Sequence, residues 1–150
     1  MIQLAENVFA SKSDPNQLDI NEKVLNRLQK IHPATVSEYD KGKGPVAWLI
    51  LIPTTLELMN RFLKKKISEK ELFGLTQPDK KYDALYLCSA MVLEEYRRKG
   101  IAKQLALKAV ENIRKDHPIK ALFVWSFSKE GNLGSEALAQ FTKLPLYKRI

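Results

Sequence analysis

Runs of apolar residues along the chain predict three strands that are covered on both faces. Each run is almost unbroken, has the length of a strand, and is bounded by polar or proline-containing segments, as is typical of buried strands in an α/β sheet. The three runs are Val46–Ile52, Ala84–Val92 and Ala121–Phe127. Two weaker patterns, at residues 2–9 and 144–147, lie near the chain ends; Pro145 restricts the second to a sheet edge.

Apolar residues at helical spacing predict helices between these strands. Side chains that can cap a helix stand in front of several of these patterns. The predicted helices are 18–31 (cap Asp19 or Asn21), 55–63 (cap Thr54 or Thr55), 68–74 (capping box of Ser68 and Glu71), 101–116 and 132–141. The helix after Gly100 has one broad apolar face, formed by Ile101, Ala102, Leu105, Ala106, Ala109, Val110 and Ile113, which we expect to be core.

The order of these elements indicates the fold class. Strand, helix and strand over residues 84–127 predict two parallel strands joined by a right-handed crossover. Residues 38–45 are polar and rich in turn formers, so the N-terminal half offers one clear strand, followed by helices. We therefore expect an α/β (α+β) protein with a mixed central sheet flanked by helices. Its 150 residues contain no repeat or linker and are interpreted as a single domain, 1–150.

The formal net charge of +8 favours an anionic binding partner. The lysine clusters 64–66 and 80–81 lie in separate segments without regular aromatic neighbours, which makes nucleic acid less favoured than a small phosphorylated ligand. No apolar run reaches the roughly 18 residues of a membrane span, and no signal segment opens the chain, so we expect a cytoplasmic protein. The single cysteine, Cys88, is interpreted as a core thiol, and no metal site is expected.

The most informative segment is the basic turn 96–104, between the apolar strand 84–92 and the long helix. The start of a helix presents free backbone N–H groups and the positive end of the helix dipole to an anion. Gly100 and Ala102 leave room for a close approach, and the turn carries four basic side chains, Arg97, Arg98, Lys99 and Lys103. The glycine spacings of a Walker loop or a dinucleotide fingerprint are absent. The alternative is a solvated basic turn.

The pattern Arg97-x-x-Gly100-x-Ala102 resembles the acetyl-CoA signature of the GNAT superfamily of N-acetyltransferases. Residues 91–96 are similar to that family's strand end and lead-in, and the resemblance covers about residues 84–142. It implies an N-acetyltransferase that moves the acetyl group of acetyl-CoA directly to a primary amine. It also implies that Met91, Val92 and Leu93 hold the pantetheine arm, with the Val92 N–H on the thioester oxygen. Arg97 of the signature is implied to bind the cofactor, and the pyrophosphate is implied to lie over Arg98, Lys99, Gly100, Ile101, Ala102 and Lys103.

The chain departs from the family where catalysis is concerned. The last helix ends in Phe141-Thr142 where a tyrosine is expected to protonate the thiolate, and Tyr147 follows five residues later. Tyr147 is therefore one candidate acid, and Ser126 is a candidate for ordering a water that relays the proton. No carboxylate lies on the fifth strand, and His32 is interpreted as a helix-end side chain, so the base is not identified.

The sequence leaves three functional interpretations open. The first is an acetyltransferase with an unidentified amine acceptor; the second is a CoA-binding or regulatory module with weak or lost catalysis. The third, nucleic-acid binding, rests on charge alone. A homodimer is left open.

Overall fold

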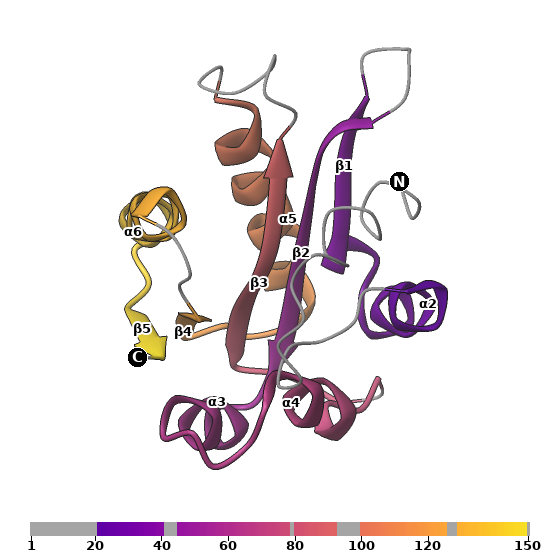
Figure 1. Ribbon diagram of the computed structural model, residues 1–150, viewed down its shortest axis with the longest axis vertical. Coiled ribbons are helices and arrows are strands. Elements are labelled where there is room, and N and C mark those ends of the chain that lie inside the picture. The colour runs from indigo at the N-terminus through magenta and orange to yellow at the C-terminus, as the bar shows by residue number, and fades with distance from the viewer. Residues whose placement is uncertain (1–20, 41–44, 79, 93–99, 126–128, 150) are drawn as a thin grey trace.

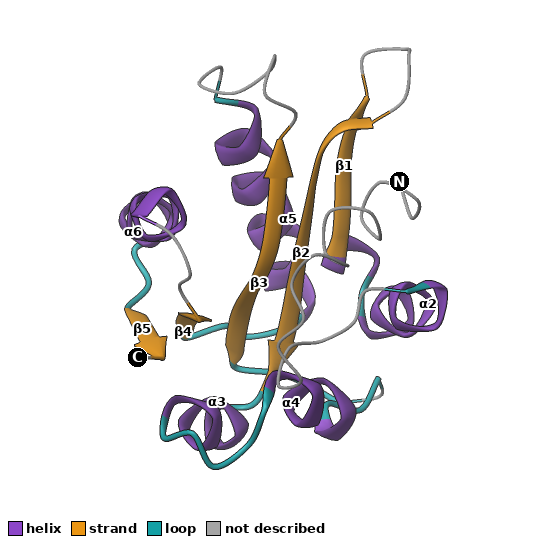
Figure 2. Cartoon of the chain, in the orientation of Figure 1, coloured by secondary structure: helices purple, strands orange, loops and turns teal. Residues whose placement is uncertain are grey.

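The computed structural model describes residues 21–40, 45–78, 80–92, 100–125 and 129–149 (Figure 1). Figure 2 distinguishes the helices, strands and loops of these segments by colour. In chain order the elements are α2 (Glu22–Ile31), η1 (Pro33–Thr35), β1 (Val36–Asp40), β2 (Pro45–Thr54), α3 (Leu56–Leu63), α4 (Glu69–Leu75), β3 (Ala84–Val92), α5 (Ile101–Asp116), β4 (Ala121–Trp125), α6 (Lys129–Thr142) and β5 (Leu146–Arg149).

One mixed sheet carries the fold, with strand order β1-β2-β3-β4-β5. The pairs β1–β2 and β2–β3 are antiparallel, whereas β3–β4 and β4–β5 are parallel. The mixed sheet and the parallel pairing across the crossover helix α5 are confirmed. Strand β5 forms the predicted sheet edge, while the weak strand predicted at 2–9 lies outside the described residues.

The prediction of a turn over residues 38–40 was wrong, because these residues belong to β1. Val36 pairs with Ile50 and Glu38 with Trp48, so β1 and β2 form an antiparallel hairpin. Among the described strands β1 pairs with β2 only, and its last three residues are exposed. A strand that needs only one neighbour tolerates polar residues, so its sequence lacks the apolar run by which buried strands are recognised.

Caps offered by the sequence start α2, α3 and α4, whereas α6 begins at Lys129, three residues before the predicted start. Asn21 accepts from the Val24 N–H at 3.0 Å and caps α2. The Thr55 side chain caps α3. At α4, Ser68 accepts from the Glu71 N–H while the Glu71 carboxylate accepts from the Ser68 N–H, which completes the capping box.

Helices cover both faces of the sheet. Residues Lys148 and Arg149 are neighbours on β5, so their side chains point to opposite faces. Lys148 reaches Glu136 of α6, and Arg149 reaches Phe62 of α3. Helix α3 therefore lies on one face and α6 on the other. Helix α5 shares the α6 face, because the Arg114 guanidinium donates to the carbonyl at the end of α6.

The core occupies both of these layers. Under α5 lie Ala106, Ala109, Val110 and Ile113, as the helical periodicity predicted. The α3 face holds an aromatic cluster of Phe62, Tyr86 and Phe123, with ring centroids 4.9–5.8 Å apart. None of the helices in the described segments is long and apolar enough to cross a membrane.

Candidate functional site

The two central parallel strands separate partway along their length. The ladder between β3 and β4 ends at Leu87, which pairs with Val124. β3 continues to Val92, and among the described strands only β2 pairs with it over this last part. Figure 1 shows β3 extending well beyond the end of β4. The β2–β3 ladder also shifts register at this level, because Leu51 pairs with Leu87 and Ile50 with Ser89. Every second peptide group of residues 88–92 therefore points to the side of β3 on which β4 pairs with residues 84–87.

The chain enters α5 at the same end of the sheet as the C-terminus of β3 (Figure 1). Gly100 has a left-handed backbone, with φ +74°, and a Cβ built there would meet nothing within 4 Å. The Gln104 N–H bonds to the Gly100 carbonyl and closes the first turn. The N–H groups of residues 101–103 precede this bond and need partners from outside the helix.

Two of the side chains on this turn are open to solvent. Ala102 is exposed, so the prediction that it belongs to the apolar core face was wrong. This position of the helix faces away from the sheet. Lys103 is also exposed, and its Nζ lies 3.7 Å from the centre of the Phe141 ring, a cation–π contact with the end of α6. Phe141 is 56% exposed. The turn thus combines backbone donors that α5 itself does not use, space and a positive charge.

The remaining predicted site residues lie elsewhere or outside the described segments. Leu93, Arg97, Arg98 and Lys99 lie outside, as does Ser126. Met91 and Val92 lie on β3 beyond its separation from β4, opposite Trp48 and Ala47 of β2. Tyr147 lies on the edge strand β5 opposite Phe123, with 46% of its surface exposed. The structure therefore brings the ends of β3 and α5 together, and leaves Tyr147 toward the other end of the sheet.

A buried carboxylate that the sequence did not single out lies on the α3 face. Glu69, in the first turn of α4, is 5% exposed, and the Tyr86 hydroxyl donates to its Oε2 at 2.5 Å. Tyr86 itself is 1% exposed. Burial, followed by the charge of Glu69, raises the pKa of Tyr86 well above its ordinary value, so the phenol stays protonated.

Two further polar groups surround this carboxylate. Burial, and then the Glu69 charge, raise the pKa of the Cys88 thiol, which fits the interpretation of Cys88 as a core thiol. The guanidinium of Arg149 lies 4.5 Å from the ring centres of both Phe62 and Trp125 and donates to a backbone carbonyl. We call these residues the Glu69 cluster: Glu69, Tyr86, Cys88, Trp125 and Arg149.

The capping-box spacing assigns Glu71 to the cap, whereas Glu69, in the same first turn, lies three and four residues before the buried Leu72 and Phe73. First-turn glutamates usually face water, where they interact with the helix dipole. Only the docking of α4 on the sheet turns one of them inward.

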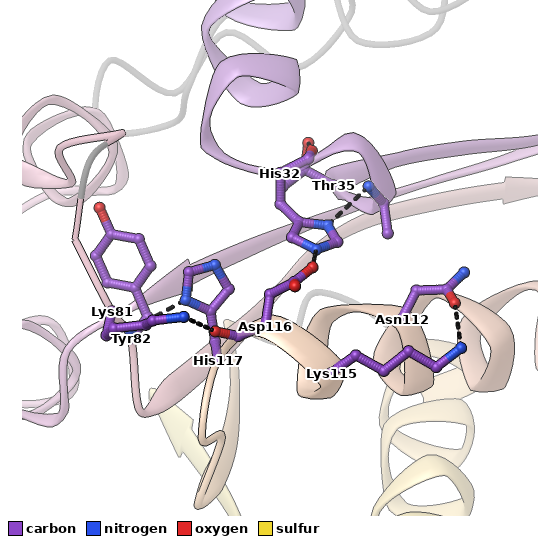
Figure 3. Close-up of polar contacts among 9 residues, drawn as sticks. His32, Thr35, Lys81, Tyr82, Asn112, Lys115, Asp116 and His117 are labelled. Carbon is purple, nitrogen blue, oxygen red and sulfur yellow. Dashed lines mark hydrogen bonds and ion pairs between the residues drawn. The ribbon is translucent and has the colours of Figure 1, made fainter.

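A second polar cluster lies at the far end of α5 (Figure 3). The His32 Nδ1 accepts from the Ala34 N–H, so its Nε2 is the atom that donates to Asp116 Oδ2, at 2.6 Å. The Nδ1 of His117 accepts from the Tyr82 N–H at 3.3 Å. His32 caps the end of α2, as predicted. Because the 16 residues of α5 span about 24 Å, this cluster is distant from Gly100 and ties helix ends together.

Comparison with known proteins finds one family match for this chain. A model described as the acetyltransferase (GNAT) family matches residues 26–141. The match begins inside α2, includes the hairpin β1–β2, and ends in α6. No curated protein matches the chain.

Proposed function

Since this chain belongs to the GNAT acetyltransferase family, we propose that it transfers an acetyl group from acetyl-CoA directly to a primary amine. One observation carries the proposal: β3 separates from β4 beside a glycine turn that opens α5. An extended thioester arm fits between separated strands because it bonds to their peptide groups as another strand would. The phosphates fit the free N–H groups at the start of the helix.

The residues of β3 and of the turn suit such a cosubstrate. We expect the peptide groups of Met91, Val92 and Leu93 to hold the arm, with the Val92 N–H on the thioester oxygen. The turn from Arg97 to Lys103 would hold the pyrophosphate, and the open space at Gly100 supports this placement. Lys103 already carries its charge at the start of α5.

The leaving thiolate needs a proton once the acetyl group has moved. We retain Tyr147 and a water ordered by Ser126 as its candidate sources. Tyr147 pairs with Phe123, before the point along the strands at which β3 and β4 separate. It can therefore protonate the thiolate only if the thioester reaches as far along β3 as this pair.

Calorimetric titration with acetyl-CoA and with CoA, at two salt concentrations, tests the cofactor site. We expect saturable one-to-one binding, followed by thiol release when a panel of primary amines is added. A folded protein that binds neither compound would contradict the proposal.

A second candidate is a CoA-binding module with weak or lost catalysis. The observation that favours it is the end of α6, where Phe141 and Thr142 stand in place of the tyrosine typical of the family. Binding of acetyl-CoA without turnover of any amine would select this candidate. Steeply salt-dependent binding of oligonucleotides, with no preference for CoA, would instead indicate a nucleic-acid-binding protein.

The compartment and the assembly state are further expectations. We expect a cytoplasmic protein from the sequence, and a homodimer stays open. Sedimentation of the purified protein tests the second point.

A further inference from the structure

Phe141, in the last turn of α6, is the most exposed large apolar side chain among the described residues, with 56% of its surface open. Single exposed apolar side chains are common on protein surfaces, so exposure alone assigns no role. What sets Phe141 apart is its neighbour, because the Nζ of Lys103 lies 3.7 Å from the centre of the ring. An aromatic face and a positive charge are therefore presented together at the surface.

This pair lies beside the turn at which we propose that the phosphates bind. Lys103 is the third residue of α5, and its N–H is one of the donors that the helix leaves without an internal partner. The Lys103 side chain extends from that position to Phe141 of α6. One lysine side chain therefore spans the gap between the proposed phosphate site and the ring.

The pair is accessible from solvent. Lys103 is exposed, and so are its chain neighbours Ala102 and Gln104 and the residue before the ring, Gln140. Helices α5 and α6 belong to the same layer of the fold, so the pair joins two neighbouring helices. A planar ligand group can therefore lie on the Phe141 ring without displacing a core residue.

The chemistry of CoA accounts for such a pair. The pyrophosphate of CoA links the thioester arm to an adenosine that carries a 3′-phosphate. If the arm runs along β3, the adenosine leaves the turn on another side, and the Lys103–Phe141 pair belongs to α5 and α6 rather than to β3. A purine ring stacks on an aromatic side chain, and an ammonium group beside it attracts the phosphates.

We infer that Phe141 binds the adenine ring of CoA by stacking, and that Lys103, held against the same ring, pairs with the phosphates of the cofactor; this inference rests on the proposed function. Phe141 is then a cofactor-binding residue and takes no part in proton transfer. The end of α6, where the family typically has the tyrosine that protonates the thiolate, serves the nucleoside end of the cofactor in this chain.

Calorimetric titration with three ligands tests this inference. CoA carries the complete nucleotide, 3′-dephospho-CoA lacks only the 3′-phosphate, and 4′-phosphopantetheine lacks the whole nucleoside. We expect the unchanged protein to bind CoA at least about tenfold more tightly than 4′-phosphopantetheine, because one base–aromatic stack contributes about that much affinity.

Phe141→Leu removes the aromatic face and keeps an apolar side chain. It should weaken the binding of CoA and 3′-dephospho-CoA by about tenfold and leave the affinity for 4′-phosphopantetheine within about twofold. Phe141→Trp keeps an aromatic face and should bind CoA within about threefold of the unchanged protein. Because Phe141 is exposed, the Tm of both variants should stay close to that of the unchanged protein.

Lys103→Gln separates the charge from the ring. It should weaken the binding of all three ligands by about three- to tenfold, since each of them carries phosphate. Lys108→Gln is the matched control, because Lys108 is an exposed lysine five residues further along α5. The control should leave all three affinities within about twofold of those of the unchanged protein.

Three outcomes would contradict the inference. Equal binding of CoA and 4′-phosphopantetheine by the unchanged protein, or an unchanged CoA affinity in Phe141→Leu, would overturn it and leave the cofactor site intact. Loss of affinity for all three ligands alike in Phe141→Leu would also overturn it, because the ring would then act only by holding Lys103. Failure of the folded protein to bind CoA at all would reject the proposed function together with the inference.

Discussion

Gly100 is the residue where backbone conformation and ligand space meet. Its φ of +74° is unfavourable for residues with a side chain, and its surroundings are empty. We predict that Gly100→Leu costs about 1–2 kcal/mol of folding stability and lowers acetyl-CoA affinity by at least about tenfold, because the side chain occupies the space of the phosphates. Calorimetry on the folded variant checks this. Unchanged affinity would contradict the placement of the phosphates at this turn.

His117 makes stability depend on pH at the far end of α5. Burial, followed by the nearby His32 and Lys81, lowers the pKa of His117 below its ordinary value of 6.5, and only Asp116 opposes this. The unfolded chain therefore binds a proton more readily than the folded chain. The contribution of neutral His117 is complete above pH 6.5 and is lost as the pH falls toward the lowered value.

We predict that the free energy of unfolding falls between pH 7.5 and pH 5.5, and that His117→Asn reduces this fall. The asparagine carbonyl can still accept the Tyr82 N–H, so the folded structure is preserved. Urea unfolding at both pH values measures the difference. Equal slopes in the two proteins would show that another group is responsible.

Among the single elements, helix α4 places the carboxylate of Glu69 in the core. It is short, seven residues long, so its stability depends on its ends. Gly74 lies within this helix with empty space around it.

Two substitutions should change the stability of α4 in opposite directions. Ser68→Ala removes the capping box and should cost about 1 kcal/mol. Gly74→Ala should add about 0.5–1 kcal/mol, since alanine loses less backbone freedom on folding than glycine. Urea unfolding of each variant measures both values. A stabilising Ser68→Ala would mean that the hydrogen bonds of the capping box contribute nothing.

At the scale of the whole molecule, a ligand that binds the folded chain alone must raise its stability. Acetyl-CoA at 100 times its Kd should add about 2.7 kcal/mol. For a chain of 150 residues, this corresponds to a rise in Tm of roughly 5–10 °C. Thermal unfolding with and without the ligand checks the prediction. Because the net charge is +8, inorganic pyrophosphate serves as the control; an equal rise with that anion would indicate charge neutralisation alone.

The sequence by itself determined the elements that rest on local chemistry. The strand at 84–92, the caps Asn21, Thr55 and Ser68, and the glycine that opens α5 are read from neighbouring residues, because apolar periodicity and capping depend on short separations along the chain. The basic turn also identified the family.

Only the tertiary structure decided the rest of the site. The polar strand β1 exists because β2 pairs with it, and in the described residues the ladder between β3 and β4 ends at Leu87. Glu69 and Glu71 stand in the same helical turn, and Glu69 is buried because α4 docks against Tyr86, 17 positions from Glu69 along the chain. These features depend on contacts between residues far apart in sequence, which no local pattern encodes.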